Sequence, residues 1–223
     1  MIHVIKNIER PSAEMIESFR GIGTATVHEA QGRKGYIQHG IRPIAAKTRI
    51  CGPAFTVAGV PRDNLMLHKA IERAQPGDVI VASVGGYYES GYWGGLMNVA
   101  AMARKLGGLA IDGCVRDSEE LIESGFPIFC RGFCIQGTAK WGLGLVNHPI
   151  VFGGAFIRPG DLILGDHDGM VVVEREACAE VLAKSQARDE AEAKKSLQLA
   201  AGVSSVEFNK LGKNFEILGL VEE

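Results

Sequence analysis

The sequence predicts an α/β fold, because apolar strand-like runs alternate with helical segments through its centre. These elements lie, in chain order, at 79–83 (strand), 96–105 (helix), 109–112 (strand), 118–124 (helix) and 127–130 (strand). Parallel strands need long crossover connections, so this order is typical of right-handed βαβ units. The 223 residues, 46% apolar and 22% charged, suit a single globular domain, residues 1–223, with its own core.

The segments before this centre are predicted to be two short helices, one long strand and a third helix. Ser12 is a typical N-cap for the first helix, and Gly21, which comes after the last apolar residue of this helix, is expected to end it. A second helix is expected over 24–30. Residues 47–60 alternate and are rich in small and branched side chains, which indicates a strand. Apolar residues at helical spacing predict a helix over 64–74.

The C-terminal part changes character, with glycine-rich turns and short strands followed by a long charged helix. Strands are expected over 149–152, 162–165 and 170–173. Pro159-Gly160-Asp161 repeats the earlier Pro76-Gly77-Asp78, which indicates the same kind of turn leading into a strand at both places. The helix over 174–201, ended by Gly202, is longer than a small domain needs to cover its own core. We therefore expect it to pack on a neighbouring subunit.

Composition excludes several classes of protein. The formal net charge is −2, with a pI near 6.3, so no basic surface for nucleic acid is expected. No apolar run is long enough to predict a membrane span, and the N-terminus has no signal-peptide pattern. Five scattered cysteines do not form a disulfide framework or a zinc motif, and Cys130 and Cys134 are expected to be small buried hydrophobes. These features predict a soluble cytoplasmic protein.

The first candidate site is Arg116-Asp117, which follows the predicted strand 109–112. Ligands of parallel sheets bind beyond the carboxyl ends of the strands. A carboxylate there can hold a hard cation such as Mg²⁺ or Mn²⁺, and a guanidinium suits a substrate carboxylate. The alternative is a loop salt bridge, with Asp117 or Ser118 capping the following helix. Asp112 is expected to be structural.

The second candidate is the glycine- and aromatic-rich loop 85–97. Gly94 and Gly95 at a helix start leave backbone N–H groups free for an anion. Because this loop and Arg116 follow adjacent strands, we expect them side by side. The aromatic residues of this loop either line the pocket or belong to the core or to an interface; they are Tyr87, Tyr88, Tyr92 and Trp93.

Three further polar segments have structural interpretations that we favour over functional ones. His28 and Glu29 could be acid/base groups, but a helix surface or a satisfied core position is the better interpretation. Asp63 or Asn64 is expected to cap a helix. Residues 165–169, GDHDG, lack the length of a calcium loop and are expected to be a tight hairpin.

Several stretches together resemble the RraA-like family, and within it the class II 4-hydroxy-4-methyl-2-oxoglutarate / 4-carboxy-4-hydroxy-2-oxoadipate aldolases. The matching stretches cover roughly residues 8–202: TVHEAQGRKG, RPI, RDN, QPGDVIV, GYWGGLM, IDGCVRD, GFPIF, QGT, VNHPIVFGG, PGDLILGDHDGMVVV and LAAG. The resemblance implies an α-β-β-α sandwich like the swivelling phosphohistidine-type domain. It also implies a homotrimer or homohexamer whose active site lies between subunits.

The resemblance also implies roles for individual residues. Asp117 would be the ligand of Mg²⁺ or Mn²⁺, and Arg116 would bind substrate and stabilise the enolate oxygen. The backbone amides of Leu96 and Met97, in the loop that starts at Gly94 and Gly95, would hold the pyruvyl carboxylate of a 2-oxo acid. Glu192 of the neighbouring subunit's C-terminal helix, or else Glu190, would hold metal-bound water.

One position departs from the family pattern: Gly95 stands where these aldolases carry a loop acid. Glu89 and Glu29 are candidate substitutes. The function implied is a metal-dependent lyase of aromatic degradation that releases pyruvate from a 4-hydroxy-2-oxo di- or tricarboxylate and also decarboxylates oxaloacetate. The alternative is a non-catalytic RraA-like protein that regulates RNase E or another partner, which the loop glycine favours.

Overall fold

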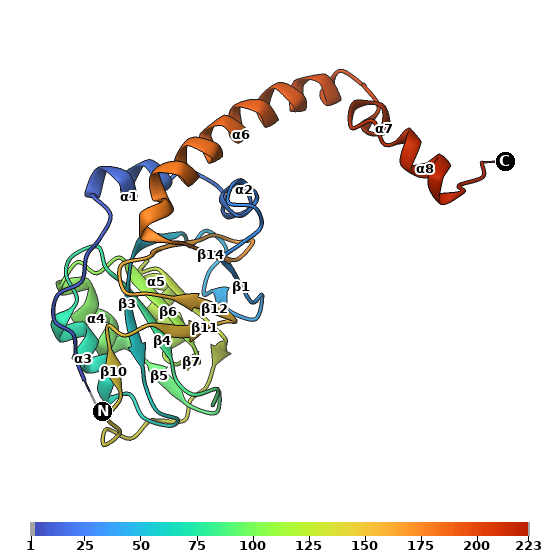
Figure 1. Ribbon diagram of the computed structural model, residues 1–223. Helices are drawn as coiled ribbons and strands as arrows, with labels where there is room; N and C mark the ends of the chain where they lie inside the picture. Colours follow the sequence, from blue (N-terminus) through green and yellow to red (C-terminus); the bar gives the residue numbers. More distant parts are fainter. Residues whose placement is uncertain (1–2, 223) are drawn as a thin grey trace.

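The structure, a computed structural model, describes residues 3–222 and shows a mixed α/β fold with a long C-terminal helix (Figure 1). The helices are α1 (Ala13–Phe19), α2 (Thr24–Ala30), α3 (Leu65–Arg73), α4 (Gly95–Ala103), α5 (Ser118–Glu123), α6 (Cys178–Ala200), α7 (Ser205–Phe208) and α8 (Gly212–Leu218). The strands are β1 (Tyr36–Ile37), β2 (Arg42–Pro43), β3 (Ile50–Ala58), β4 (Val79–Ser83), β5 (Gly91–Trp93), β6 (Gly108–Asp112), β7 (Cys114–Val115), β8 (Ile128–Cys130), β9 (Gly132–Phe133), β10 (Leu145–Val146), β11 (Ile150–Phe152), β12 (Ala155–Ile157), β13 (Leu162–Gly165) and β14 (Met170–Val173).

Nine strands form one mixed sheet in the order β1-β14-β13-β3-β4-β6-β8-β2, with β10 paired beside β3. The pairs β3–β4, β4–β6 and β6–β8 are parallel, which confirms the predicted βαβ units. The outer strands β1, β14, β13 and β2 pair antiparallel to their neighbours. The α/β class is therefore confirmed. The more specific likeness to swivelling phosphohistidine-type domains stays a prediction.

Three hydrophobic cores lie on the faces of this sheet, and the alternation of side chains along the strands separates them. In β4, Ile80 packs with helices α3, α4 and α5, whereas Val81 points into an inner core. In β13, Ile163 joins the same inner core, whereas Leu164 packs with α1, α2 and α6. Two halves of a curled sheet thus face each other, and each carries helices on its outer face.

The two Pro-Gly-Asp turns adopt the same structure, as their sequences predict. The backbone N–H of Gln75 donates to Asp78 Oδ2 at 2.8 Å, and that of Arg158 donates to Asp161 Oδ2 at 2.8 Å. The intervening glycines have φ of 87° and 85°, in the left-handed region that favours glycine. Both turns lead directly into a buried strand. Asp78 also binds Arg10 through two hydrogen bonds of 2.7 and 2.8 Å.

The C-terminal helix leaves the body of the protein after its first turns (Figure 1). A short 3₁₀ turn, Arg175–Ala177, precedes the 23 residues of α6, which the sequence predicts as one helix over 174–201. The buried residues of α6 all lie in its first eight positions: Cys178, Val181 and Ser185. Beyond them the helix is almost entirely exposed, as are α7 and α8 at its far end. No helix within residues 3–222 is long and apolar enough to cross a membrane.

Candidate functional site

A small three-stranded parallel sheet, β5-β7-β9, carries the candidate residues beyond the carboxyl edge of the main sheet. β7 continues from β6 after Gly113, and β9 continues from β8 after Arg131. The N–H of Arg116 donates to Trp93 O at 2.9 Å, so the ends of β5 and β7 lie side by side. The predicted adjacency of the glycine loop and Arg116-Asp117 is confirmed. The strand β5 inside that loop was not predicted.

Arg116 lies across glycines that leave room for its side chain. A Cβ atom at Gly91 would come within 2.8 Å of Arg116 Cβ, and one at Gly94 within 3.1 Å of Arg116 Nε. At Gly137 the corresponding distance, to Arg116 Nη1, is 3.4 Å. The side chain is nevertheless 47% exposed, so its guanidinium remains accessible to a ligand. Close packing against Arg116 and its neighbours Cys134 and Asp117 thus favours glycine at 91 and 94, whereas Gly137 makes only an ordinary contact.

Asp117 has an unusual backbone and an accessible carboxylate. Its φ of 59° and ψ of 42° are left-handed, a conformation that costs a non-glycine residue free energy and persists only where neighbours enforce it. Its Oδ2 accepts a hydrogen bond from Gly95 N at 3.0 Å and lies 3.8 Å from Arg116 Nε. Asp117 occupies the N-cap position of α5, but its side chain does not cap that helix. The salt bridge of the alternative interpretation is therefore present, but its capping part is wrong, because the carboxylate turns toward the glycine loop.

Glu120 occupies the space beside Gly95, a contact that sequence reasoning missed. The three atoms nearest to a Cβ built at Gly95 all belong to the Glu120 carboxylate, so a side chain at this position would require that carboxylate to move. Glu29, one suggested substitute, is instead bound to Arg33 at 2.9 Å on α2. The available signal was the spacing from Asp117 to Glu120, because residues three apart share one face of a helix.

The start of α4 offers backbone donors next to these carboxylates. Helical bonding begins with Asn98 N donating to Gly94 O at 3.0 Å, and Gly95 N is taken by Asp117. The amides of Leu96 and Met97 precede that first bond and have no partner within a helix. The side chain of Leu96 is 90% exposed, whereas Met97 is buried. The loop can therefore present two amides to an anion from outside the chain.

Both candidate glutamates of the C-terminal helix lie on its exposed part. Glu192 pairs with Arg188 of its own helix at 2.8 Å, and Glu190 is exposed. Residues 3–222 of one chain contain no group of three or more His, Cys, Asp or Glu side chains placed to hold a metal ion. Asp117 is therefore not part of a cluster of three or more such side chains among the described residues.

The aromatic loop residues divide between core and surface. Tyr92 and Trp93 are fully buried, and Tyr92 Oη donates to Tyr87 O at 2.9 Å. Tyr88 is 40% exposed and shares Asp112 with Arg131, whose Nε donates to Asp112 at 2.7 Å. Asp112 is thus structural, as expected.

The remaining candidates also have structural roles. Asp63 accepts from Leu65 N at 2.8 Å at the start of α3, as a capping residue does. Residues 165–169 form the predicted hairpin between β13 and β14. There burial acts to raise the pKa of Asp166, but hydrogen bonds from Thr24 and Asp168 outweigh it and lower that pKa. All five cysteines are free, and burial raises the pKa of Cys130 to about 11.

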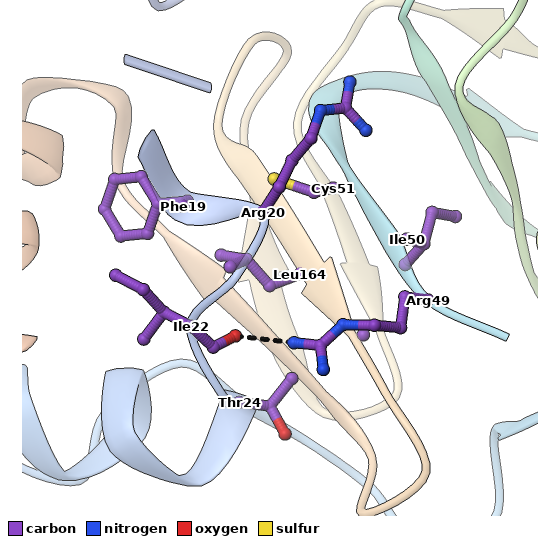
Figure 2. Close-up of a pocket in the computed structure, with 9 residues that line it drawn as sticks. Phe19, Arg20, Ile22, Thr24, Arg49, Ile50, Cys51 and Leu164 are labelled. Carbon is purple, nitrogen blue, oxygen red and sulfur yellow. Dashed lines mark hydrogen bonds between the residues drawn. The ribbon is translucent and has the colours of Figure 1, made fainter. Parts of the chain in front are cut away.

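A partly open cavity of about 220 Å³ lies at the opposite edge of the sheet, at the start of β3 (Figure 2). It lies between the α1–α2 connection and the ends of β3 and β13, and one of its lining residues, Arg49, donates to Ile22 O at 2.8 Å. Asp117 follows the carboxyl end of β6, which runs parallel to β4 and β3. This cavity is therefore separate from the candidate site.

Comparison with known proteins assigns the chain to a family. The family described as "RraA-like: Aldolase/RraA" matches residues 24–172. A protein of Halalkalibacterium halodurans named "Putative 4-hydroxy-4-methyl-2-oxoglutarate aldolase" is 40% identical over 183 residues, covering 80% of this chain and 86% of that protein.

Two crystal structures share the fold. An uncharacterized protein of Pseudomonas syringae has a TM-score of 0.78 at 29% identity, covering 90% of this chain and 98% of that one. Streptomyces coelicolor RraAS2, titled an unusual member of the RNase ES inhibitor RraA protein family, has a TM-score of 0.77 at 26% identity, covering 85% of this chain and 99% of that one. The chain belongs to the RraA-like family.

Proposed function

We propose that this protein is a divalent-metal-dependent lyase that releases pyruvate from a 2-oxo di- or tricarboxylate, by retro-aldol cleavage of a 4-hydroxy-2-oxo acid and by decarboxylation of oxaloacetate. The observation that carries the proposal is the meeting of Arg116, Asp117 and the start of α4 at the carboxyl ends of adjacent parallel strands. A relative named as an aldolase at 40% identity supports the same chemistry.

Asp117 fits a hard divalent cation. Its carboxylate supplies oxygen ligands and is 45% exposed, and Mg²⁺ commonly takes one or two carboxylates while keeping several waters. When bound, Mg²⁺ or Mn²⁺ supplies Lewis acidity toward the oxygens of a 2-oxo acid. The left-handed backbone at Asp117 and the bond from Gly95 N fix the direction of this carboxylate.

The chain's own groups act on both ends of the pyruvyl unit. The amides of Leu96 and Met97 hold its carboxylate, aided by the positive end of α4. When the C3–C4 bond breaks, its electron pair moves onto the pyruvyl fragment, and negative charge develops on the 2-oxo oxygen. The Arg116 guanidinium stabilises that charge by hydrogen bonding. Protonation of C3 then gives pyruvate in both reactions.

Glu120 supplies the acid/base group that the loop lacks at Gly95. In retro-aldol cleavage, the C4 hydroxyl must lose a proton as the C–C bond breaks, so a base is needed. Decarboxylation releases CO₂ and needs no such base. The position of the Glu120 carboxylate beside Gly95 places it next to Asp117, where a loop acid would otherwise lie.

Replacing Glu120 with glutamine is therefore expected to lower kcat for retro-aldol cleavage by about 100-fold, the scale of general base catalysis. Decarboxylation of oxaloacetate should fall much less, because it does not use the base. Glu119→Gln is the matched control, since Glu119 is an exposed neighbour in the same turn of α5. Equal losses in both reactions, or an equal effect of Glu119→Gln, would contradict the role of Glu120.

Introducing an acid at position 95 is a second test of the role of Glu120. An aspartate at position 95 would collide with the Glu120 carboxylate and add a like charge. We therefore expect Gly95→Asp alone to lower activity. The double variant with Glu120→Gln should recover retro-aldol cleavage relative to the single Glu120→Gln variant.

The proposal includes a homotrimer or homohexamer in which a neighbouring subunit completes the site. Beyond Ser185 the helix α6 is almost entirely exposed, although Asp189 accepts a hydrogen bond from Thr26 Oγ1 at 3.0 Å, and Glu190 and Glu192 lie on this exposed part. Either glutamate could hold water near Asp117 of another chain.

The direct experiment measures pyruvate release from oxaloacetate and from a 4-hydroxy-2-oxo acid, with Mg²⁺ and with EDTA, after subtraction of the rate with metal alone. The proposal expects catalysis of both reactions with Mg²⁺ and none with EDTA. A second candidate, a non-catalytic regulator of RNase E or another partner, is supported by the likeness to RraAS2. Absence of pyruvate release from both substrates would favour that candidate.

A further inference from the structure

A pair of histidines far apart in sequence meets at the surface, and neither belongs to the proposed site. His3 Nδ1 and His148 Nε2 are 3.1 Å apart, and the rings are inclined at 67°. Only one proton can lie between two nitrogens at this separation, so at least one of them presents a lone pair to the other. Neither histidine is used by the proposed reaction.

The backbone around the pair is fixed by hydrogen bonds on both sides. Val146 N donates to His3 O at 3.1 Å, and Ile5 N donates to Val146 O at 3.1 Å. The Thr56 hydroxyl donates to His148 O at 2.6 Å. The imidazoles are thus presented by an N-terminal segment and a loop that are already joined, so bringing them together costs little further ordering.

We propose that His3 and His148 form a binding site for an imidazole-preferring divalent cation, such as Zn²⁺, Ni²⁺ or Cu²⁺. Two histidine nitrogens on a tetrahedral zinc ion, each at 2.0–2.1 Å, lie about 3.3 Å apart. Because His3 Nδ1 and His148 Nε2 are 3.1 Å apart, the two rings need to separate only slightly to bind the ion. The cation takes the place of the hydrogen between the two nitrogens, and that proton moves through solvent to the other ring nitrogen of the same histidine, so both imidazoles bind as neutral rings.

Water completes the coordination of this site. His3 is exposed, and it borders an open cavity of about 380 Å³ whose wall also includes His68 and Glu72. Because no group of three or more potential metal ligands exists within residues 3–222, the site has two protein ligands and open positions. Such a site favours nitrogen-preferring metals over Mg²⁺, which selects oxygen ligands. It is therefore chemically distinct from Asp117.

Titration calorimetry of the untagged protein with ZnCl₂ tests the proposal. One Zn²⁺ per chain is expected, with binding that weakens as the pH is lowered, because only neutral imidazole coordinates. Each of His3→Gln and His148→Gln should lower the Zn²⁺ affinity by more than about 10-fold. Replacing a residue that only hydrogen-bonds to a metal ligand already costs about 10-fold or more, and these histidines are proposed to be the ligands themselves. Zn²⁺ should also raise the Tm of the parent protein and not that of the two variants.

Two control variants separate this site from others. His167→Gln removes an exposed histidine from the β13–β14 hairpin and should leave Zn²⁺ binding unchanged. Asp117→Asn should also leave it unchanged, so that failure of the proposed lyase function and failure of this site are distinguishable. Unchanged binding in both His3→Gln and His148→Gln, or loss of binding in His167→Gln or Asp117→Asn, would overturn the proposal.

Discussion

Replacing Arg116 with alanine is expected to lower kcat for pyruvate release by about 10²–10³-fold, the scale of removing one preorganised donor to a developing oxyanion. The Arg116 side chain lies against Gly91, Gly94 and Gly137 and beside Asp117, where the negative charge is proposed to develop. Initial rates with oxaloacetate and Mg²⁺, in the parent and the variant, measure the effect. Because Arg116 is half-exposed, the Tm should change little.

Two further variants make this result specific. Arg116→Lys keeps a positive charge but loses the planar fork, so it should recover part of the lost rate. Arg33→Ala removes an arginine that is 74% exposed and pairs with Glu29 on α2, and its kcat should equal that of the parent. A normal kcat in Arg116→Ala would show that Arg116 does not stabilise the transition state.

Replacing Asp78 with alanine is expected to have the largest effect on stability. Its side chain is fully buried and binds Arg10, which is 18% exposed, through two hydrogen bonds, while also accepting from Gln75 N. Removing one partner of such a pair leaves a charge without its counterion and costs about 3 kcal/mol or more. For a domain of this size, the Tm should fall by roughly 6–12 °C.

Thermal unfolding followed by circular dichroism measures this change. Glu72→Ala is the matched control, because Glu72 pairs with Lys69 at 2.7 Å on the exposed surface of α3. Its Tm should equal that of the parent within error, since exposed ion pairs contribute little to stability. Similar Tm values for the two variants would contradict a structural role for the Arg10–Asp78 pair.

The fold could be predicted where the sequence has long, regular patterns. The buried runs at 79–83 and 109–112 and the helices between them appear where periodicity indicates them. The two-residue strands β1, β2, β7, β9 and β10 could not be predicted, because two residues show no alternation. Likewise β5 and β12 are too short, and α7 and α8 lack a buried face that would produce an apolar stripe.

Part of the candidate site could also be predicted, because it depends on the order of the regular strands. Arg116 and Asp117 could be paired with the glycine loop because adjacent parallel strands end at one edge. The contact between Glu120 and Gly95 depends on the direction in which α5 leaves Asp117, and that follows from the left-handed backbone there. No sequence pattern predicts such a backbone at an aspartate.

The most direct test of the central claim is a crystal structure of the protein soaked with Mg²⁺ and pyruvate. The account predicts a cation bound to the Asp117 carboxylate, with the pyruvate carboxylate at the amides of Leu96 and Met97 and its 2-oxo oxygen facing Arg116. Density for Mg²⁺ and pyruvate away from these residues, or an empty cleft with Asp117 still bonded only to Gly95, would contradict it.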